Sequence, residues 1–256
     1  MPKNKPEKQK PIDSPERKYR DQVEAEFVTL LKFCKELNIN GLHVPNEELL
    51  NLESCVTTYN EFITKIGRSE IEWPPKEYTS VIAIAQHYGI PTRFTDWSYD
   101  PSVAAFFAAK DASPGEAKEA ISVYAVNLFE SGLRGRATPF CFGQNELMRK
   151  KERWYQVVNA PSEHNGNLRA QRGLFIGYFE KNFQANDFFK PYSLDEYVTG
   201  LKGYLPMKKF ILPMGEVNDL SRILNVRHYN SSTMFPGIEG CVRKIYEDKD
   251  YDFGAF

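Results

Sequence analysis

The chain has 256 residues, and its 33 lysines and arginines against 34 aspartates and glutamates give a formal net charge of −1. This balance argues against a protein that binds nucleic acid or membranes through bulk charge, although a local basic patch remains compatible with it. Hydrophobic residues make up 41% and aromatic residues 14% of the chain, which excludes global disorder. No apolar run approaches the ~20 residues that cross a bilayer, and the N-terminus lacks the apolar stretch of a secretion signal. The sequence therefore predicts a soluble, cytoplasmic protein without a membrane partner.

The four cysteines stand apart in the sequence, with no Cys-x-x-Cys pair and no histidine at ligand spacing. Such spacing favours neither a disulfide framework nor a zinc site. We expect reduced thiols and no metal.

The N-terminal part is predicted to be helical up to about residue 75. Residues 1–20 are basic and rich in proline, which indicates a flexible tail. A long helix should follow and end before Gly41, because apolar residues recur at steps of three and four. These residues are Val23, Phe27, Leu30, Leu31, Cys34 and Leu37. A shorter helix is expected around residues 59–66.

A helix, a strand and another helix are predicted in the centre of the chain. Thr79 and Ser80 can cap a short apolar helix over residues 81–88, which Gly89 ends in the left-handed conformation. Pro91 forces an extended path, so residues 92–97 should form a strand. Ser98 or Asp100 then caps a helix that begins at Pro101.

Further strands and helices are mixed without a βαβ rhythm or a visible repeat. We predict strands at 121–128 and 210–212, a strand pair at 168–179 interrupted by Gly173 and Gly177, and helices at 193–201 and 217–224. The predicted fold class is therefore α+β, with one domain over residues 21–246 and an acidic tail at 247–256.

Polar residues are concentrated between residues 85 and 109, where a helix end, a strand and a helix start follow one another. Backbone N–H groups and side-chain donors converging there suit an anionic ligand such as a phosphate. Arg93 can hold a phosphate with two hydrogen bonds, and Asp96 can accept from a ribose hydroxyl or fix Arg93. Alternatively, His87, Arg93 and Asp96 form a buried hydrogen-bond network that is only structural.

The same segment resembles a known family. The string QHYGIPTRFTDWSYDPSVAAFFA is similar to the signature of the FRG domain of bacteria and phages, QHYGLPTRLLDWT followed by a small-residue helix. Asn167–Phe175 resembles the family's N-x-R-x-x-Q-x-G-x-F segment, and Met234–Gly240 resembles its FP-x-x-(D/E)-G ending. The resemblance covers about residues 20–246. The N-terminal Phe-Arg-Gly strand that names the family is not recognisable, since Tyr19-Arg20-Asp21 lacks the glycine.

This resemblance implies an ADP-ribosyltransferase-like mixed sheet core and NAD as co-substrate. Such enzymes hold the nicotinamide ribose on a polar strand that leads into an Ala/Phe-rich helix, and stabilise positive charge at C1′. By analogy, Thr95 or Ser98 contacts the ribose, Trp97 or Tyr99 stacks on a ring, and Arg93 binds phosphate. The predicted cofactor-binding residues are Gln86, His87, Tyr88, Thr92, Arg93, Thr95, Trp97 and Ser98.

The predicted catalytic residues are Gln171, Arg93 and Asp96. Gln171 occupies the place comparable to the catalytic glutamate of the superfamily, but a glutamine carries no charge to stabilise an oxocarbenium. Alternatively, Gln171 only satisfies a neighbouring backbone group. Glu180 and Glu239 are candidate acids if the fold brings either of them near, although Glu239 also suits a surface or capping carboxylate.

Two basic stretches, residues 133–136 and 149–155, are candidates to receive an acceptor. Basic residues next to aromatic rings fit single-stranded nucleic acid, whereas a solvated helix face is the alternative. The family resemblance implies an ADP-ribosyltransferase that acts as a toxin or phage-defence effector on a macromolecule and is neutralised by an antitoxin. RNA or single-stranded DNA is slightly favoured over protein as the acceptor. The alternatives are an inactive NAD or nucleotide sensor and an interaction scaffold.

Overall fold

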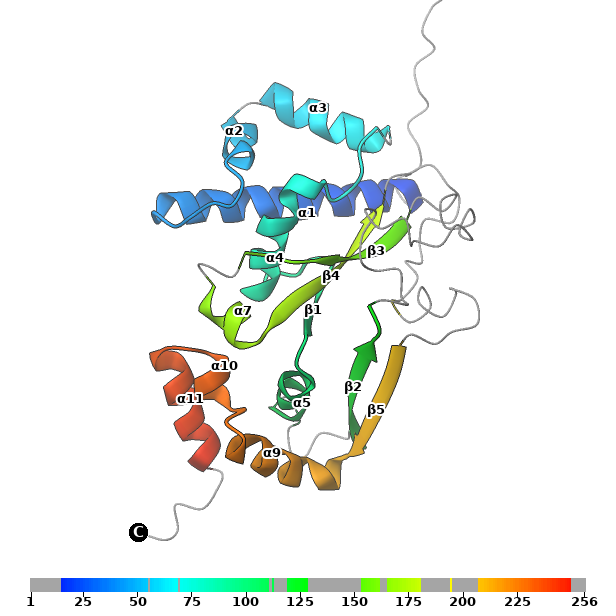
Figure 1. Cartoon of the computed structure of the whole chain (residues 1–256). Helices are drawn as coiled ribbons and strands as arrows, with labels where there is room; N and C mark the ends of the chain where they lie inside the picture. Colours follow the sequence, from blue (N-terminus) through cyan, green and yellow to red (C-terminus); the bar gives the residue numbers. More distant parts are fainter. Residues whose placement is uncertain are drawn as a thin grey trace, which may run out of the picture. The chain divides into compact units, whose positions relative to one another are not determined.

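The computed structural model describes residues 15–54, 56–68, 70–110, 112, 119–128, 153–161, 165–180, 194 and 207–249. Helices, antiparallel strand pairs and short 3-10 turns alternate along the chain (Figure 1), which confirms the predicted α+β class. The chain divides into two compact units. The first comprises Met1–Thr92, Gln144–Trp154 and Tyr178–Ser193, and the second comprises Arg93–Gly143, Tyr155–Gly177 and Leu194–Phe256.

The first unit is built on the long helix α1 (Pro15–Ile39). Its apolar stripe is buried as predicted, with Leu37 alone half-buried. Phe27, fully buried, lies at the centre of an aromatic cluster. The ring centroids of Tyr59, Phe62, Trp73 and Tyr78 all lie between 4.4 and 6.2 Å from that of Phe27. Helix α1 begins before residue 21, where the sequence placed the end of a flexible tail.

Three further helices and one 3-10 turn follow α1 in this unit. They are α2 (Glu48–Ser54), α3 (Val56–Gly67), the turn η1 (Lys76–Tyr78) and α4 (Thr79–His87). Helix α3 confirms the helix predicted around residues 59–66. The predicted capping of α4 by Thr79 and Ser80 is wrong, because η1 runs directly into the helix. Tyr78 is the N-cap residue, and the Thr79 hydroxyl donates to the Lys76 carbonyl at 2.7 Å. Gly89 ends the helix with φ +87°, as expected.

In the second unit, β1 (Phe94–Ser98) pairs antiparallel with β4 (Gly173–Glu180), from Phe94 opposite Gly177 to Ser98 opposite Gly173. Strand β3 (Arg153–Val158) lies on the other side of β4 in a three-stranded sheet. The strand pair predicted at 168–179 is wrong. The Asn165 side chain accepts from the Leu168 N–H and caps the helical turn α7 (Gly166–Ala170), so only the later part is a strand.

A second sheet contains β2 (Ala120–Val126) and β5 (Met207–Pro213), paired antiparallel over their whole length. Helix α5 (Pro101–Lys110) packs beside β2, and Ala109, Ile121 and Val217 form a small buried cluster there. Val217 begins the predicted late helix α9 (Val217–Val226), and Leu224 of α9 packs with Val103 and Phe106 of α5. These elements confirm the strands and the helix expected from the apolar pattern.

Two helices follow α9 that the sequence pattern did not predict. They are α10 (Ser231–Met234) and α11 (Ile238–Lys249), which lie against each other. Helix α11 includes the first residues of the segment predicted as an acidic tail from residue 247.

Five of the sequence predictions fall wholly or partly outside the described residues. These are the flexible tail at 1–20, described from residue 15, the acidic tail at 247–256, described up to residue 249, the helix predicted at 193–201, of which only Leu194 is described, the basic stretch at 133–136, and residues 149–152 of the second basic stretch. Residues 153–155 begin β3, so the alternative of a solvated helix face is wrong for them. Within the described residues, no helix has the length and apolar character that a membrane span requires, and no cluster of metal-ligating side chains occurs.

Candidate functional site: the turn from β1 into α5

Ser98 and Asp100 shape the turn at which β1 leads into α5. The Ser98 hydroxyl donates to the Gln171 carbonyl at 2.7 Å and accepts from the Asp100 N–H at 2.9 Å. The Asp100 carboxylate then accepts from the Ser102 N–H at 2.9 Å, at the start of the helix. Asp100 thus caps α5, as the sequence predicted, while Ser98 ties the turn to the segment that precedes β4.

Asp100 does more than cap the helix, and this was not apparent from the sequence. Its side chain is 10% exposed, accepts from the Tyr229 hydroxyl at 3.0 Å and lies 3.5 Å from the Arg172 guanidinium. Arg172 has a positive φ of 47° at the turn between α7 and β4. Three segments that are distant in sequence therefore meet at one buried carboxylate, which fixes the turn.

Polar side chains of β1 are linked to one another and to β4. The Thr95 hydroxyl donates to the Ile176 carbonyl at 3.2 Å and accepts from the Trp97 indole N–H at 2.8 Å. Thr95 and Asp96 are exposed, while Trp97 and Ser98 are half-buried and Phe94 is buried. A hydroxyl has one hydrogen and two lone pairs, so Thr95 and Ser98 each retain capacity to accept one more hydrogen bond. A ribose hydroxyl can supply such a donor.

Gln171 lies at the C-cap of α7, next to this turn. Its carbonyl accepts from Ser98, and its side-chain amide donates to the Met234 carbonyl at 3.0 Å. Gln171 and Ser98, which are both predicted site residues, are therefore in contact, and Gln171 makes this contact through its backbone carbonyl. Its role in catalysis stays a prediction.

The other predicted residues of the second unit are Arg93 and Asp96. Arg93 is half-buried and directly precedes β1, whereas Asp96 is exposed in the middle of the strand, opposite Phe175. Because Asp96 is exposed, it does not fit the alternative in which it belongs to a buried hydrogen-bond network.

Four predicted cofactor-binding residues belong to the first unit. The Thr92 hydroxyl donates to the Gln86 side-chain oxygen at 2.8 Å, and this bond joins the end of α4 to the segment after Gly89. The rings of His87 and Tyr88 meet edge to face at 5.5 Å. Their assignment to NAD stays a prediction.

The two candidate acids, Glu180 and Glu239, make other contacts. Glu180 ends β4, at the opposite end of that strand from Gly173, and is 1% exposed. Its backbone exchanges two hydrogen bonds with Trp73, and the Tyr178 hydroxyl lies 3.4 Å from its carboxylate. Glu239 lies in the first turn of α11 with a side chain that is 78% exposed, and it pairs with Arg243.

These observations define an α+β protein with a polar strand-to-helix turn. Residues 19–117 match the FRG domain, which confirms the family resemblance seen in the sequence. The match includes α4, β1 and α5 but not Gln171 or the two later stretches that resemble the family. No curated protein and no solved structure was found that matches the chain.

Proposed function

We propose that the protein is an NAD-dependent ADP-ribosyltransferase that modifies a macromolecule, with an ADP-ribosyltransferase-like core. The observation that carries the proposal is the polar strand β1 leading into the small-residue helix α5, inside the segment that matches the FRG domain. The remaining acceptor capacity of Thr95 and Ser98 supports ribose binding at this turn.

The reaction breaks the bond between C1′ of the nicotinamide ribose and the ring nitrogen. Nicotinamide leaves as a neutral molecule with the electron pair, and an oxygen or nitrogen of the acceptor bonds to C1′ and loses its proton. In this proposal Arg93 binds phosphate, Asp96 accepts from a ribose hydroxyl, and Trp97 stacks on a ring. In the same proposal, nucleic acid is slightly favoured over protein as the acceptor. The protein then acts as a toxin or phage-defence effector and has a neutralising partner.

The proposal is tested by nicotinamide release from NAD, with RNA, single-stranded DNA or cell lysate added as acceptor and transferred ADP-ribose detected by mass. We expect release that depends on one acceptor and is lost in Arg93→Ala and Asp96→Asn. Arg222→Ala and Asp219→Asn are matched controls, because this exposed pair in α9 repeats the same residue types away from the turn. Folded site variants that keep full activity contradict the residue assignments.

A second candidate function is a module that binds NAD or a related nucleotide without turnover. The uncharged Gln171, whose amide is engaged with the Met234 carbonyl, favours it. In that case NAD raises the melting temperature, while no nicotinamide appears after long incubation. If neither NAD nor ADP-ribose raises the melting temperature, the remaining hypothesis is an interaction scaffold.

A further inference from the structure

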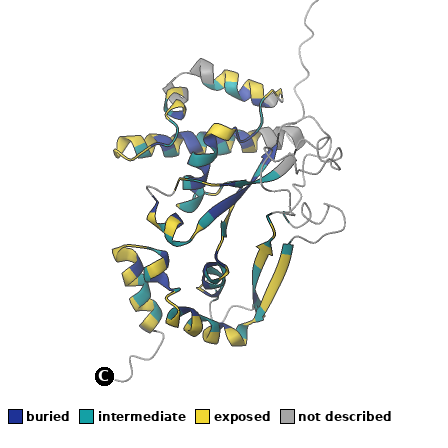
Figure 2. Ribbon diagram, viewed as in Figure 1, coloured by how far each residue is buried: buried dark blue, intermediate teal, exposed yellow. Residues whose placement is uncertain are grey.

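Helix α11 exposes its apolar residues. Ile238 is 85% exposed, Val242 44%, Ile245 54% and Tyr246 63%, and Cys241 is exposed as well. Residues at steps of three and four share one face of a helix, so these five side chains form one stripe, here called the α11 stripe. Most of α11 is correspondingly coloured as exposed or intermediate (Figure 2).

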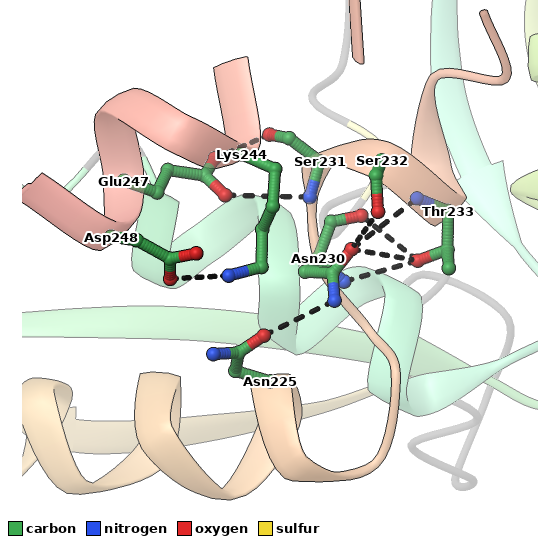
Figure 3. A network of polar contacts seen from close by, with 8 residues as sticks. All are labelled: Asn225, Asn230, Ser231, Ser232, Thr233, Lys244, Glu247 and Asp248. Carbon is green, nitrogen blue, oxygen red and sulfur yellow. Dashed lines mark hydrogen bonds and ion pairs between the residues drawn. The ribbon is translucent and has the colours of Figure 1, made fainter. Parts of the chain in front are cut away.

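The opposite, polar side of α11 faces the rest of the second unit. The Glu247 carboxylate accepts from the hydroxyl and the N–H of Ser231, which is fully buried at the start of α10 (Figure 3). The Arg243 guanidinium lies 4.7 Å from the centroid of the Phe235 ring. These contacts set the rotation of the helix about its axis, so that the α11 stripe points away from α10.

Gly240 makes this orientation hard to change. A Cβ atom at Gly240 would lie 1.9 Å from the Phe235 carbonyl oxygen and 2.8 Å from that of Ser231. The two backbones therefore approach as closely as only glycine allows. Exposure of the stripe is thus a consequence of close packing on the other side of the helix.

The spacing of the stripe is self-complementary. Ile238, Cys241, Val242 and Ile245 are placed symmetrically about the midpoint between positions 241 and 242. When two copies of α11 pack antiparallel about this midpoint, Ile238 of each copy lies at the level of Ile245 of the other. Cys241 likewise lies at the level of Val242. A contact of this kind is isologous, as in most two-fold dimers.

The charges beside the stripe fit the same arrangement. Glu239 and Arg243 form an ion pair on one flank of α11, with side chains 78% and 42% exposed. Reversing one helix brings this same flank of both copies together. Glu239 then lies at the level of position 244 of the second copy, one residue or ~1.5 Å along the axis from Arg243. The two glutamates and two arginines alternate, so each charge gains an opposite neighbour.

We propose that α11 is a homodimerisation surface, on which a second copy of this chain packs antiparallel through the α11 stripe. The inference is independent of the transferase proposal. One helix per copy provides an interface at the small end of those seen in proteins, so the dimer is weak and forms reversibly at micromolar concentrations.

Sedimentation velocity of the full chain across micromolar concentrations tests the proposal. We expect a concentration-dependent shift from monomer to dimer, abolished by Val242→Glu. Val226→Glu is the matched control, because Val226 is an apolar residue of α9 that is 76% exposed and lies outside the stripe. Circular dichroism and thermal melting establish that both variants are folded. A monomeric wild-type chain over the whole range overturns the proposal, as does a Val242→Glu variant that dimerises like the wild type.

Charge exchange tests the antiparallel geometry. Glu239→Arg places two arginines on the flank and Arg243→Glu places two glutamates there, so each variant alone should dimerise less than the wild type. An equimolar mixture of the two should recover the dimer as a heterodimer, and the chain carrying both substitutions should dimerise with itself. A mixture that stays as weak as its components overturns the antiparallel arrangement.

Discussion

Helices α1 and α11 carry similar apolar stripes, but the stripe of α1 is buried and that of α11 is exposed. In α1, Val23, Phe27 and Cys34 are at most 1% exposed and pack inside the first unit. In α11, Ile238, Val242 and Ile245 are exposed while glycine and charged residues face inward. The comparison teaches that spacing defines a face of a helix, whereas the neighbouring segments decide what covers that face.

Of the substitutions compared between the two helices, one at Phe27 is expected to lower the free energy of unfolding most. Phe27→Ala removes a ring that contacts four other aromatic side chains, and the loss of buried area plus the cavity should lower the free energy of unfolding by about 3–5 kcal/mol. Val242→Ala in α11 is the matched control and should change it by less than ~0.5 kcal/mol. Urea unfolding at a protein concentration low enough to keep the chain monomeric measures both. Equal losses in the two variants would show that the α11 stripe is covered within the monomer.

Much of the first unit could be predicted from the sequence because its signals are local. Steps of three and four located α1 and α3, and Gly89 with Pro91 located the end of α4 and the extended segment after it. Helix α11 was missed because its apolar positions are mixed with Gly240 and with charged residues that pack inward.

In the candidate site, too, local signals in the sequence predicted some features, whereas the contacts between distant segments were not predicted. Asp100 was predicted as a cap, since Asp-Pro-Ser is a local signal for the start of a helix. Its contacts with Tyr229 and Arg172 bring together segments more than 70 residues apart in the sequence, and no spacing rule reveals them. The family resemblance alone placed Gln171 and Ser98 in one predicted site, and the bonds of Gln171 to Ser98 and to the Met234 carbonyl became visible only in the structure.

The next largest effect is expected at Gly240, where the inward face of α11 touches backbone. Gly240→Ala forces the Phe235 carbonyl or the helix to move and should destabilise the protein by about 1–3 kcal/mol. Gly166→Ala is the control, because a Cβ there would meet nothing within 4 Å. The thermal midpoint should fall for the first variant and stay within a few degrees for the second. An unchanged midpoint for Gly240→Ala would mean that α11 is not fixed by this contact.

A smaller effect is expected from Glu247, which attaches α11 to the start of α10. Glu247→Ala leaves the buried Ser231 hydroxyl and N–H without this acceptor, and we expect a loss of about 1–2 kcal/mol. Glu239→Ala removes an exposed carboxylate of the same helix and should lower stability by ~0.5 kcal/mol or less. Amide hydrogen exchange should rise throughout α11 in the first variant. Equal exchange in both variants would show that the polar inner face does not hold the helix.

Cys34 and Cys241, one in each stripe, can be compared in the wild-type protein, because one labelling experiment measures the reactivity of both thiols. Cys34 on α1 is fully buried, and burial raises the pKa of its thiol from the ordinary 9.0 to about 11, whereas Cys241 on α11 is exposed. At one pH, a shift of that size reduces the reactive thiolate of Cys34 about a hundredfold relative to an ordinary cysteine. Labelling with a thiol reagent, read by peptide mass spectrometry, should therefore modify Cys241 first and Cys34 only after unfolding.

The same shift fixes the sign of a pH effect on stability. Because the pKa of Cys34 is higher in the folded chain than in the unfolded one, its contribution is fully present below pH 9 and is lost as the pH rises toward 11. Cys34→Ala should therefore flatten the fall in unfolding free energy over this window, while Cys241→Ala should leave the fall unchanged. If both variants follow the wild-type curve, thiol ionisation is not coupled to folding. Burial of the α1 stripe would then not be what distinguishes the two cysteines.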